Sequence, residues 1–293
     1  MIQSYRSGLI SIFVCAFVLA TDVSAQIQVH MRMQKSDYVA HEQVLASVTI
    51  TNRAGRDLYI HSEGPQAWLD FDVFGQRGTA LSPLRRGSNF KAVRIGAGQS
   101  VSKTIDLNSL YRVSNQGRYR VRANIRLPGG EGAVFTSNYV GFNVTKARAI
   151  YRQRIGVAGS KNVREYRVMS FTSQRKNVLY VQVEDVATGR MMQTYQLGEA
   201  LMFRKPTATV DGQNNLHVLH LVSPTVFSRS RVSPDGKFLG RDLFKRGATG
   251  APRLTTFGNG EVVVAGGVPY DPKKQAAKRK KIRRVSERPK IAF

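Results

Sequence analysis

Cysteine and acidic residues are both scarce in this sequence. Cys15 is the single cysteine of 293 residues, which excludes a disulfide scaffold and a zinc site built from several cysteines. The 19 acidic residues are outnumbered by 45 lysines and arginines, so the formal net charge is +26. Such an excess predicts an anionic partner. A hydrophobic content of 42% still allows two domains, each with a core of its own.

Motifs that carry catalysis are missing as well. The sequence has no Gly-x-Ser-x-Gly nucleophile turn and no Gly-x-x-x-x-Gly-Lys-Ser/Thr phosphate loop. On the strand expected around them, His217 and His220 point to opposite faces, so one metal ion cannot reach both. Asp70 and Asp72 share a strand face, where we expect salt bridges rather than a glycosidase pair. We therefore predict no catalytic residues, no metal site and no cofactor.

Long apolar runs are absent except near the N-terminus. Arg6 precedes an apolar stretch, Leu9–Ala20, that is too short for a comfortable membrane span. Val23-Ser24-Ala25 then offers the small residues that a signal peptidase recognises, which predicts a signal peptide over residues 1–25. An uncleaved signal anchor is the alternative. Cleavage would leave no cysteine, which indicates a bacterial protein that is secreted, periplasmic or on the cell surface, with no transmembrane span.

Alternation of apolar and polar residues predicts strands throughout residues 26–145. The clearest are Ile27–Met33 and Val44–Ile50, and turn residues follow the second at Asn52–Gly55. Five further strands are expected at Asp57–Ile60, Trp68–Phe74, Val101–Leu107, Arg118–Leu127 and Tyr139–Val144. Seven strands with almost no helical periodicity predict a β-sandwich.

One motif in this region resembles a known family. The segment Asn115–Val121 (Asn-Gln-Gly-Arg-Tyr-Arg-Val) is similar to the Asp-x-Gly-x-Tyr-x-Cys signature of immunoglobulin-like domains. Tyr38, ahead of the Val44–Ile50 strand, adds a similarity to bacterial modules of the macroglobulin type and of the proteinase-inhibitor (BsuPI-like) type. The resemblance implies that Tyr119 is structural, its hydroxyl bonded to the backbone a few residues upstream. It implies a fold and leaves the function open.

The Arg118–Leu127 strand carries the clearest charge pattern. Its apolar residues alternate with Arg118, Arg120, Arg122, Asn124 and Arg126. Neighbours on one strand face lie about 7 Å apart, within a Debye length, so their positive potentials add. The four arginines are therefore candidate anion-binding residues. The other interpretation is a solvated face that keeps the sandwich soluble.

A second strand-rich region follows at residues 164–270, after a basic segment, residues 146–163, that we expect to be a linker. Pro206–Gly212 matches Pro252–Gly258 at an offset of 46 residues, and Val186–Arg190 corresponds to Val232–Lys237 at nearly the same offset. Such a period resembles the blades of a β-propeller. Because the region is too short for a closed ring, we expect an open, propeller-like meander or a second sandwich.

The C-terminal residues 271–293 are expected to be a disordered basic tail, because they lack apolar mass and carry many like charges. The tail residues considered as anion-binding candidates are Lys273, Lys274, Lys278, Arg279, Lys280, Lys281, Arg283 and Arg284.

These observations predict an all-β protein that acts as a secreted, non-enzymatic binding or envelope-associated module. Its expected partner is an anionic polymer or surface: polysaccharide, lipid headgroups, cell-wall polymer or extracellular nucleic acid. A protein partner stays open. One alternative is a proteinase inhibitor that uses the loops Ser62–Gln66 or Thr79–Ser88. Another is a hydrolase with a site in the second β domain.

Overall fold

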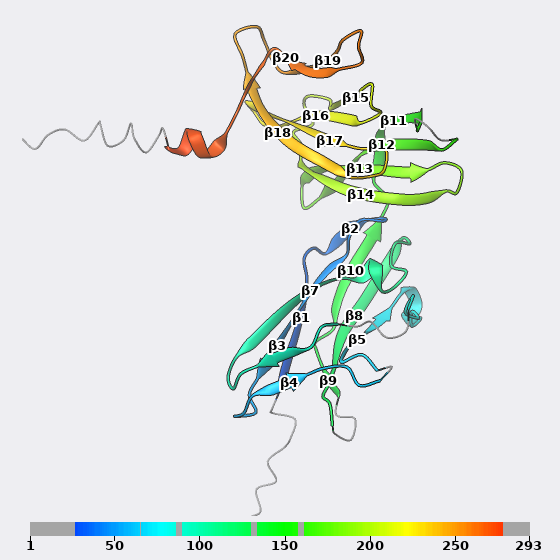
Figure 1. Cartoon of the computed structure of the whole chain (residues 1–293), viewed down its shortest axis with the longest axis vertical. Coiled ribbons are helices and arrows are strands. Elements are labelled where there is room, and N and C mark those ends of the chain that lie inside the picture. Colours follow the sequence, from blue (N-terminus) through cyan, green and yellow to red (C-terminus); the bar gives the residue numbers. More distant parts are fainter. Residues whose placement is uncertain (1–26, 65, 86–89, 130–133, 158–160, 278–293) are drawn as a thin grey trace, which may run out of the picture.

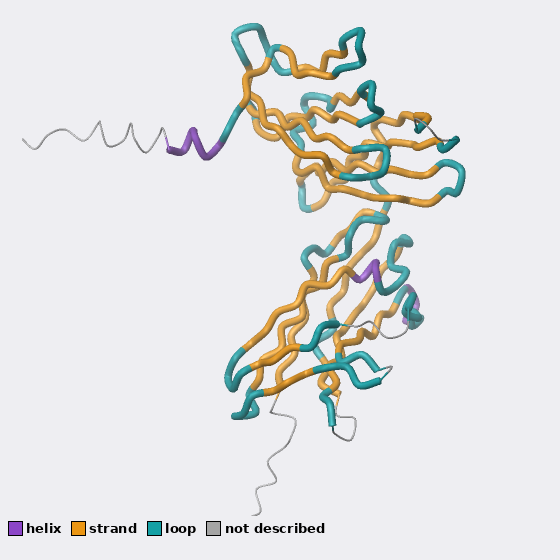
Figure 2. Tube along the Cα trace, viewed as in Figure 1, coloured by secondary structure: helices purple, strands orange, loops and turns teal. Residues whose placement is uncertain are grey.

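The computed structural model describes residues 27–64, 66–85, 90–129, 134–157 and 161–277. Over these residues the chain forms two lobes stacked along its longest axis (Figure 1). Strands dominate both lobes (Figure 2) and form several sheets, which confirms the all-β class. The helices found among the described residues lack the length and hydrophobicity of a membrane-spanning segment.

The first lobe consists mainly of two sheets that share one hydrophobic core. The smaller sheet has the order β1 (Ile27–Met33), β3 (Leu45–Asn52), β7 (Ser100–Asp106). The larger has the order β2 (Asp37–Val39), β10 (Val140–Thr145), β8 (Gly117–Arg126), β5 (Leu69–Phe74), with β9 (Val134–Thr136) also paired to β8. A separate pair joins β4 (Leu58–Ile60) to β6 (Val93–Ile95). All these pairings are antiparallel except that of β2 with β10.

The period-2 pattern of the sequence produces this core. Alternate residues of β1, β3 and β8 are buried, and those between them face outward. The seven strands expected from the sequence are present, with ends shifted by at most two residues. Three more strands, β2, β6 and β9, have three residues each, which is too short to produce a recognisable alternation.

The tyrosine implied by the family resemblance makes the expected bond. The Tyr119 hydroxyl donates to the Asn115 carbonyl oxygen at 2.8 Å, so this expectation is confirmed. The Tyr119 ring is buried and stacks on Phe142, with ring centroids 5.2 Å apart. Tyr119 therefore fixes the loop before β8 to the core.

We expect Tyr119→Phe to destabilise the protein by about 1 kcal/mol, because the ring is kept while one intramolecular hydrogen bond is lost. Urea unfolding followed by Trp68 fluorescence measures the change, since this tryptophan is buried in the same core. Tyr59→Phe is the matched control, because Tyr59 is 61% exposed. Equal losses in the two variants would show that the corner bond contributes nothing.

The second lobe is a stack of two sheets and a hairpin. Its first sheet has the order β11 (Arg148–Gly156), β12 (Val163–Ser173), β13 (Lys176–Asp185), β14 (Arg190–Glu199). The second has the order β15 (Thr207–Val210), β16 (Leu216–Ser223), β17 (Val226–Val232), β18 (Phe238–Arg246), β21 (Gly267–Pro269). The hairpin pairs β19 (Arg253–Thr256) with β20 (Val262–Ala265). The 46-residue offset of the sequence match separates the first residues of β15 and β19, and also those of β16 and β20.

The strand β16 of the middle sheet is buried on both faces. Leu216 and Val218 belong to the core shared with the first sheet, whereas Leu219 and Leu221 belong to a second core that includes Leu254 of the hairpin. Six consecutive residues of β16 are therefore buried, without alternation.

The structure differs from the sequence expectations at two segments. Residues 148–156 of the expected linker form β11, because Tyr151 and Ile155 pack into the lobe between outward arginines. Residues 272–277 of the expected disordered tail are helical. The carboxylate of Asp271 accepts from the backbone N–H of Lys273 at 2.9 Å, which caps the start of this helix. The expected signal peptide and residues 278–293 lie outside the described residues.

Candidate functional site

The four candidate arginines of β8 lie on the outer face of the larger sheet of the first lobe. They face outward because the residues that alternate with them, such as Tyr119 and Val121, fill the core. Arg118 and Arg120 are exposed, and Arg122 and Arg126 are half-buried.

Neighbouring strands change the charge of this face. Arg122 lies opposite Asp72 of β5, and its Nε is 2.7 Å from Oδ2 of that carboxylate. The salt bridge expected at Asp72 is thus present, while Asp70 accepts a hydrogen bond from the Tyr111 hydroxyl at 3.0 Å. Because β5 supplies carboxylates, the face is less positive than β8 alone suggests. Among the residues described, no carboxylate pairs with the three other candidates, Arg118, Arg120 and Arg126.

Two aromatic rings accompany the arginines. The Arg120 guanidinium lies 4.5 Å from the ring centroid of Tyr139 and 5.6 Å from that of Phe74. Arg122 lies 4.9 Å from the same Tyr139 ring, which is 41% exposed. Opposite Arg120 on β10 stands Gly141. Sequence reasoning did not single out Tyr139, because only the register of β10 brings it beside Arg120.

The tail candidates lie apart from β8 as far as the chain is described. Lys273 and Lys274 are exposed on the short helix that leaves the second lobe (Figure 1). The other tail candidates lie outside the described residues: Lys278, Arg279, Lys280, Lys281, Arg283 and Arg284.

A cleft of about 690 Å³ in the second lobe contains an Asp–His pair, the feature that a hydrolase would need. The Nε2 atom of His217 lies 2.9 Å from Oδ2 of Asp211. Burial lowers the pKa of His217, partly opposed by the hydrogen bond to Asp211. Burial alone would raise the pKa of Asp211, but hydrogen bonds from His217 and Asn215 outweigh it and lower the pKa.

This pair organises the turn that precedes β16. The Nδ1 atom of His217 is buried and has no hydrogen-bond partner among the residues described, while Asp211 occupies Nε2. Asp211 also accepts from the backbone N–H groups of Gln213 and Asn215.

The remaining sequence expectations concern metal ions and loops. His217 pairs with Arg231 across β16 and β17, and His220 pairs with Ser228, so the two histidines point to opposite faces as expected. Within the described segments, no group of three or more His, Cys, Asp or Glu side chains could hold a metal ion. Both loops considered for protease inhibition, Ser62–Gln66 and Thr79–Ser88, contain residues outside the description.

Comparison with known proteins gives little further information. No family model matches the chain, and the sequence of no curated protein matches it. One similar solved structure is the sporulation control protein Spo0M from Bacillus subtilis, at 10% identity and a TM-score of 0.25. The match covers 89% of this chain and 97% of that one. We draw nothing about fold or function from a similarity of this extent.

Proposed function

We propose that this chain is an exported, non-enzymatic binding protein of the bacterial envelope that holds an acidic polysaccharide along the outer face of β8. The observation that supports it is the row formed by Arg118, Arg120 and Arg126, which face outward without a carboxylate partner among the described residues. In this proposal the first lobe is an immunoglobulin-like sandwich, supported by the Tyr119 corner bond. The second is an open, propeller-like array, supported by the 46-residue offset between its hairpins.

The geometry of the row suits a linear partner. From Arg118 to Arg126 the strand extends about 27 Å at its usual rise per residue. Acidic groups spaced along a polymer can meet several guanidinium groups at once. Each contact releases condensed counterions, so the affinity is expected to fall steeply with salt.

The side chains around the row favour polysaccharide over the other anionic partners. Binding to lipid usually buries several apolar side chains, whereas two large exposed ones accompany these arginines: Tyr139, and Val134 opposite Arg126. Binding of single-stranded nucleic acid usually needs free aromatic faces for stacking, and the Tyr139 ring is already in contact with Arg120 and Arg122. Guanidinium groups bind carboxylate and sulfate-like oxyanions well.

Neutralising the row tests the proposal. We expect a variant with Arg118→Gln, Arg120→Gln and Arg126→Gln to elute from immobilised heparin at lower salt. The log–log slope of affinity against salt should become shallower by about 2 to 3, since each lost contact removes roughly 0.7–0.9. Titration of a heparin-derived oligosaccharide at several salt concentrations measures the slope.

The control carries the same change of charge elsewhere on the first lobe. Arg53, Arg56 and Arg112 are exposed and lie outside β8. Their replacement by glutamine should leave the slope nearly unchanged. Equal effects of the two triple variants would show that binding depends only on net charge, which would contradict a site on β8. A larger effect on a single-stranded DNA oligonucleotide than on heparin would contradict the choice of polysaccharide.

A further inference from the structure

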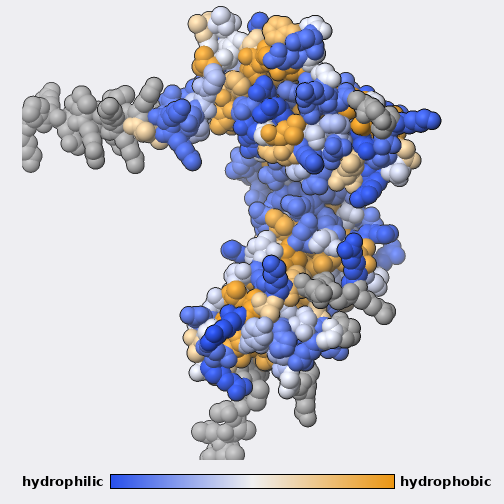
Figure 3. Space-filling model, in the orientation of Figure 1, coloured by the Kyte–Doolittle hydropathy of each residue, from blue (hydrophilic) through white to orange (hydrophobic). Residues whose placement is uncertain are grey.

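A second pocket, which we call the joint pocket, lies where the two lobes meet. It has a volume of about 340 Å³. Its walls come from the loop after β2, the segment between β10 and β11, and the first sheet of the second lobe. Small-molecule sites commonly have volumes of about 300–1,000 Å³ and are frequent between domains. Hydrophilic residues dominate the surface near this junction on the face shown in Figure 3.

The walls of the joint pocket are held together by contacts between the lobes. The Gln182 side chain of β13 donates to the Ala40 carbonyl oxygen at 3.0 Å. Lys35 of the first lobe donates to the Gln196 side chain at 2.9 Å and pairs with the buried Glu42 at 2.7 Å. The neighbouring His41 has a φ of 69°, an uncommon conformation for a residue other than glycine. The loop is thus fixed in a specific shape against the second lobe.

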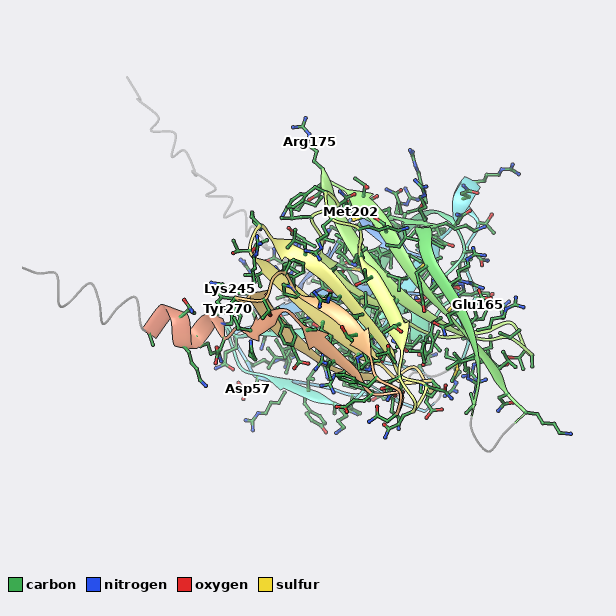
Figure 4. All side chains as sticks on the ribbon, turned by 90° about the horizontal axis from the view of Figure 1, so that it is seen from above. Asp57, Glu165, Arg175, Met202, Lys245 and Tyr270 are labelled. Atoms are coloured by element: carbon green, nitrogen blue, oxygen red, sulfur yellow. The ribbon has the colours of Figure 1, made fainter. Side chains whose placement is uncertain are left out.

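The charge of the joint pocket is positive. Lys146, Arg152 and Arg167 line it, and within the described residues its lining includes no carboxylate. Arg167 is held by salt bridges to Glu184 and to Glu165, the latter at 2.5 Å (Figure 4 labels Glu165 on β12). Lys146 and Arg152 have no carboxylate partner in the described part of the chain. Two cations are therefore left for a ligand.

Apart from His41 and Gln182, the rest of the lining is apolar. It consists of small or flexible side chains: Val39, Ala40, Ala147, Ala149, Met169 and Met191. An inorganic ion alone would leave this surface unused. A ligand that joins one compact oxyanion group to a carbon skeleton would contact both the cations and the apolar side chains.

We propose that the joint pocket binds a small organic anion of the size of an acidic or phosphorylated monosaccharide. Lys146 and Arg152 donate charge-assisted hydrogen bonds to its oxyanion, and the Ala147–Ala149 segment and the methionines contact its carbon atoms. Because the ligand touches the Ala40–His41 loop as well as the second lobe, it stabilises the arrangement of the two lobes. This site is separate from the β8 face and does not depend on the polymer binding proposed above.

Isothermal titration with glucose 6-phosphate, glucuronate, inorganic phosphate and glucose tests the proposal. We expect saturable binding of the first two ligands, weaker binding of phosphate and none of glucose. Lys146→Gln with Arg152→Gln should raise the Kd about tenfold or more, because two charge-assisted contacts are lost. Amide NMR shifts during the titration should move at His41 in the first lobe and at Ala149 in the second.

The matched control removes two cations that do not line the pocket. Arg148 is exposed on β11, and Arg175 projects from the turn between β12 and β13 (Figure 4). The Arg148→Gln, Arg175→Gln variant should keep its Kd within about twofold, since only long-range charge is changed. The proposal is overturned if the charged probes do not saturate, if glucose binds equally well, or if the control variant loses as much affinity. Heparin binding by the pocket variant reports separately on the β8 face.

Discussion

The protein should lose stability between pH 7 and pH 5, and replacing His220 with leucine should abolish most of this loss. His220 is 2% exposed, and neither of its ring nitrogens has a hydrogen-bond partner in the part of the chain described. Burial, reinforced by the nearby positive charge of Arg241, lowers the pKa of His220 to about 4. The native state therefore keeps the ring neutral, whereas the unfolded chain takes up a proton near the ordinary value of 6.5.

The sign of the effect follows from this depressed pKa. Stability from the neutral ring is fully present above pH 6.5 and is lost as the pH falls towards 4. At pH 5 the loss is about 2 kcal/mol. The leucine variant should unfold at nearly the same urea concentration at both pH values, apart from smaller contributions of His41 and His217, whose pKa values are also lowered by burial.

Urea unfolding followed by circular dichroism at pH 7 and pH 5 measures this effect. His30→Leu is the control, because His30 is exposed on β1 and should leave the pH dependence unchanged. An unaltered pH dependence in His220→Leu would mean that the ring is hydrated or protonated in the native state.

Replacing Gly260 with alanine should destabilise the second lobe by about 3 kcal/mol. The residue has a φ of +81°, and a Cβ atom there would lie 2.8 Å from the Cα of Gly212. Gly212 also donates its backbone N–H to the Gly260 carbonyl oxygen at 2.8 Å. The variant must therefore bear backbone strain and separate the β19–β20 turn from the β15–β16 turn.

Hydrogen exchange of the β19–β20 amides and the urea midpoint of the second lobe measure the loss. Gly189→Ala separates the two causes, because Gly189 has a φ of +64° and no atom within 4 Å of an added Cβ. It should lose only about 1 kcal/mol from strain. If both variants lose the same amount, the contact between the two turns has no stabilising role.

The sequence predicted the first lobe well because most of its strands bury a single face. Such strands alternate, and β1, β3 and β8 could be placed from that pattern alone. The Tyr119 bond was expected from the resemblance of Asn115–Val121 to the immunoglobulin-like signature. The strand β11 was missed because its arginines dominate the composition of the segment and hide the inward residues Ile150, Tyr151 and Ile155.

Sites that depend on register or docking could not be predicted. The partner of Arg122 became visible only when β5 was placed opposite β8, since residues 50 positions apart then face each other. The joint pocket depends on how the loop at Ala40 meets Gln182, which no local pattern encodes. The one sign of the pocket in the sequence was the basic segment that contains Lys146 and Arg152. From the sequence alone we expected this segment to be a linker.

The stack of the second lobe ends in a layer of only two strands. An isolated two-stranded ribbon is at best marginally stable in water, so β19 and β20 owe their order to the surface beneath them. Leu219 and Phe227 supply that surface, while Phe257 at the hairpin end is 53% exposed. Opening this layer would break one small apolar contact region and leave the core around Tyr166 intact. We therefore expect the β19–β20 layer to unfold locally before the two larger sheets do.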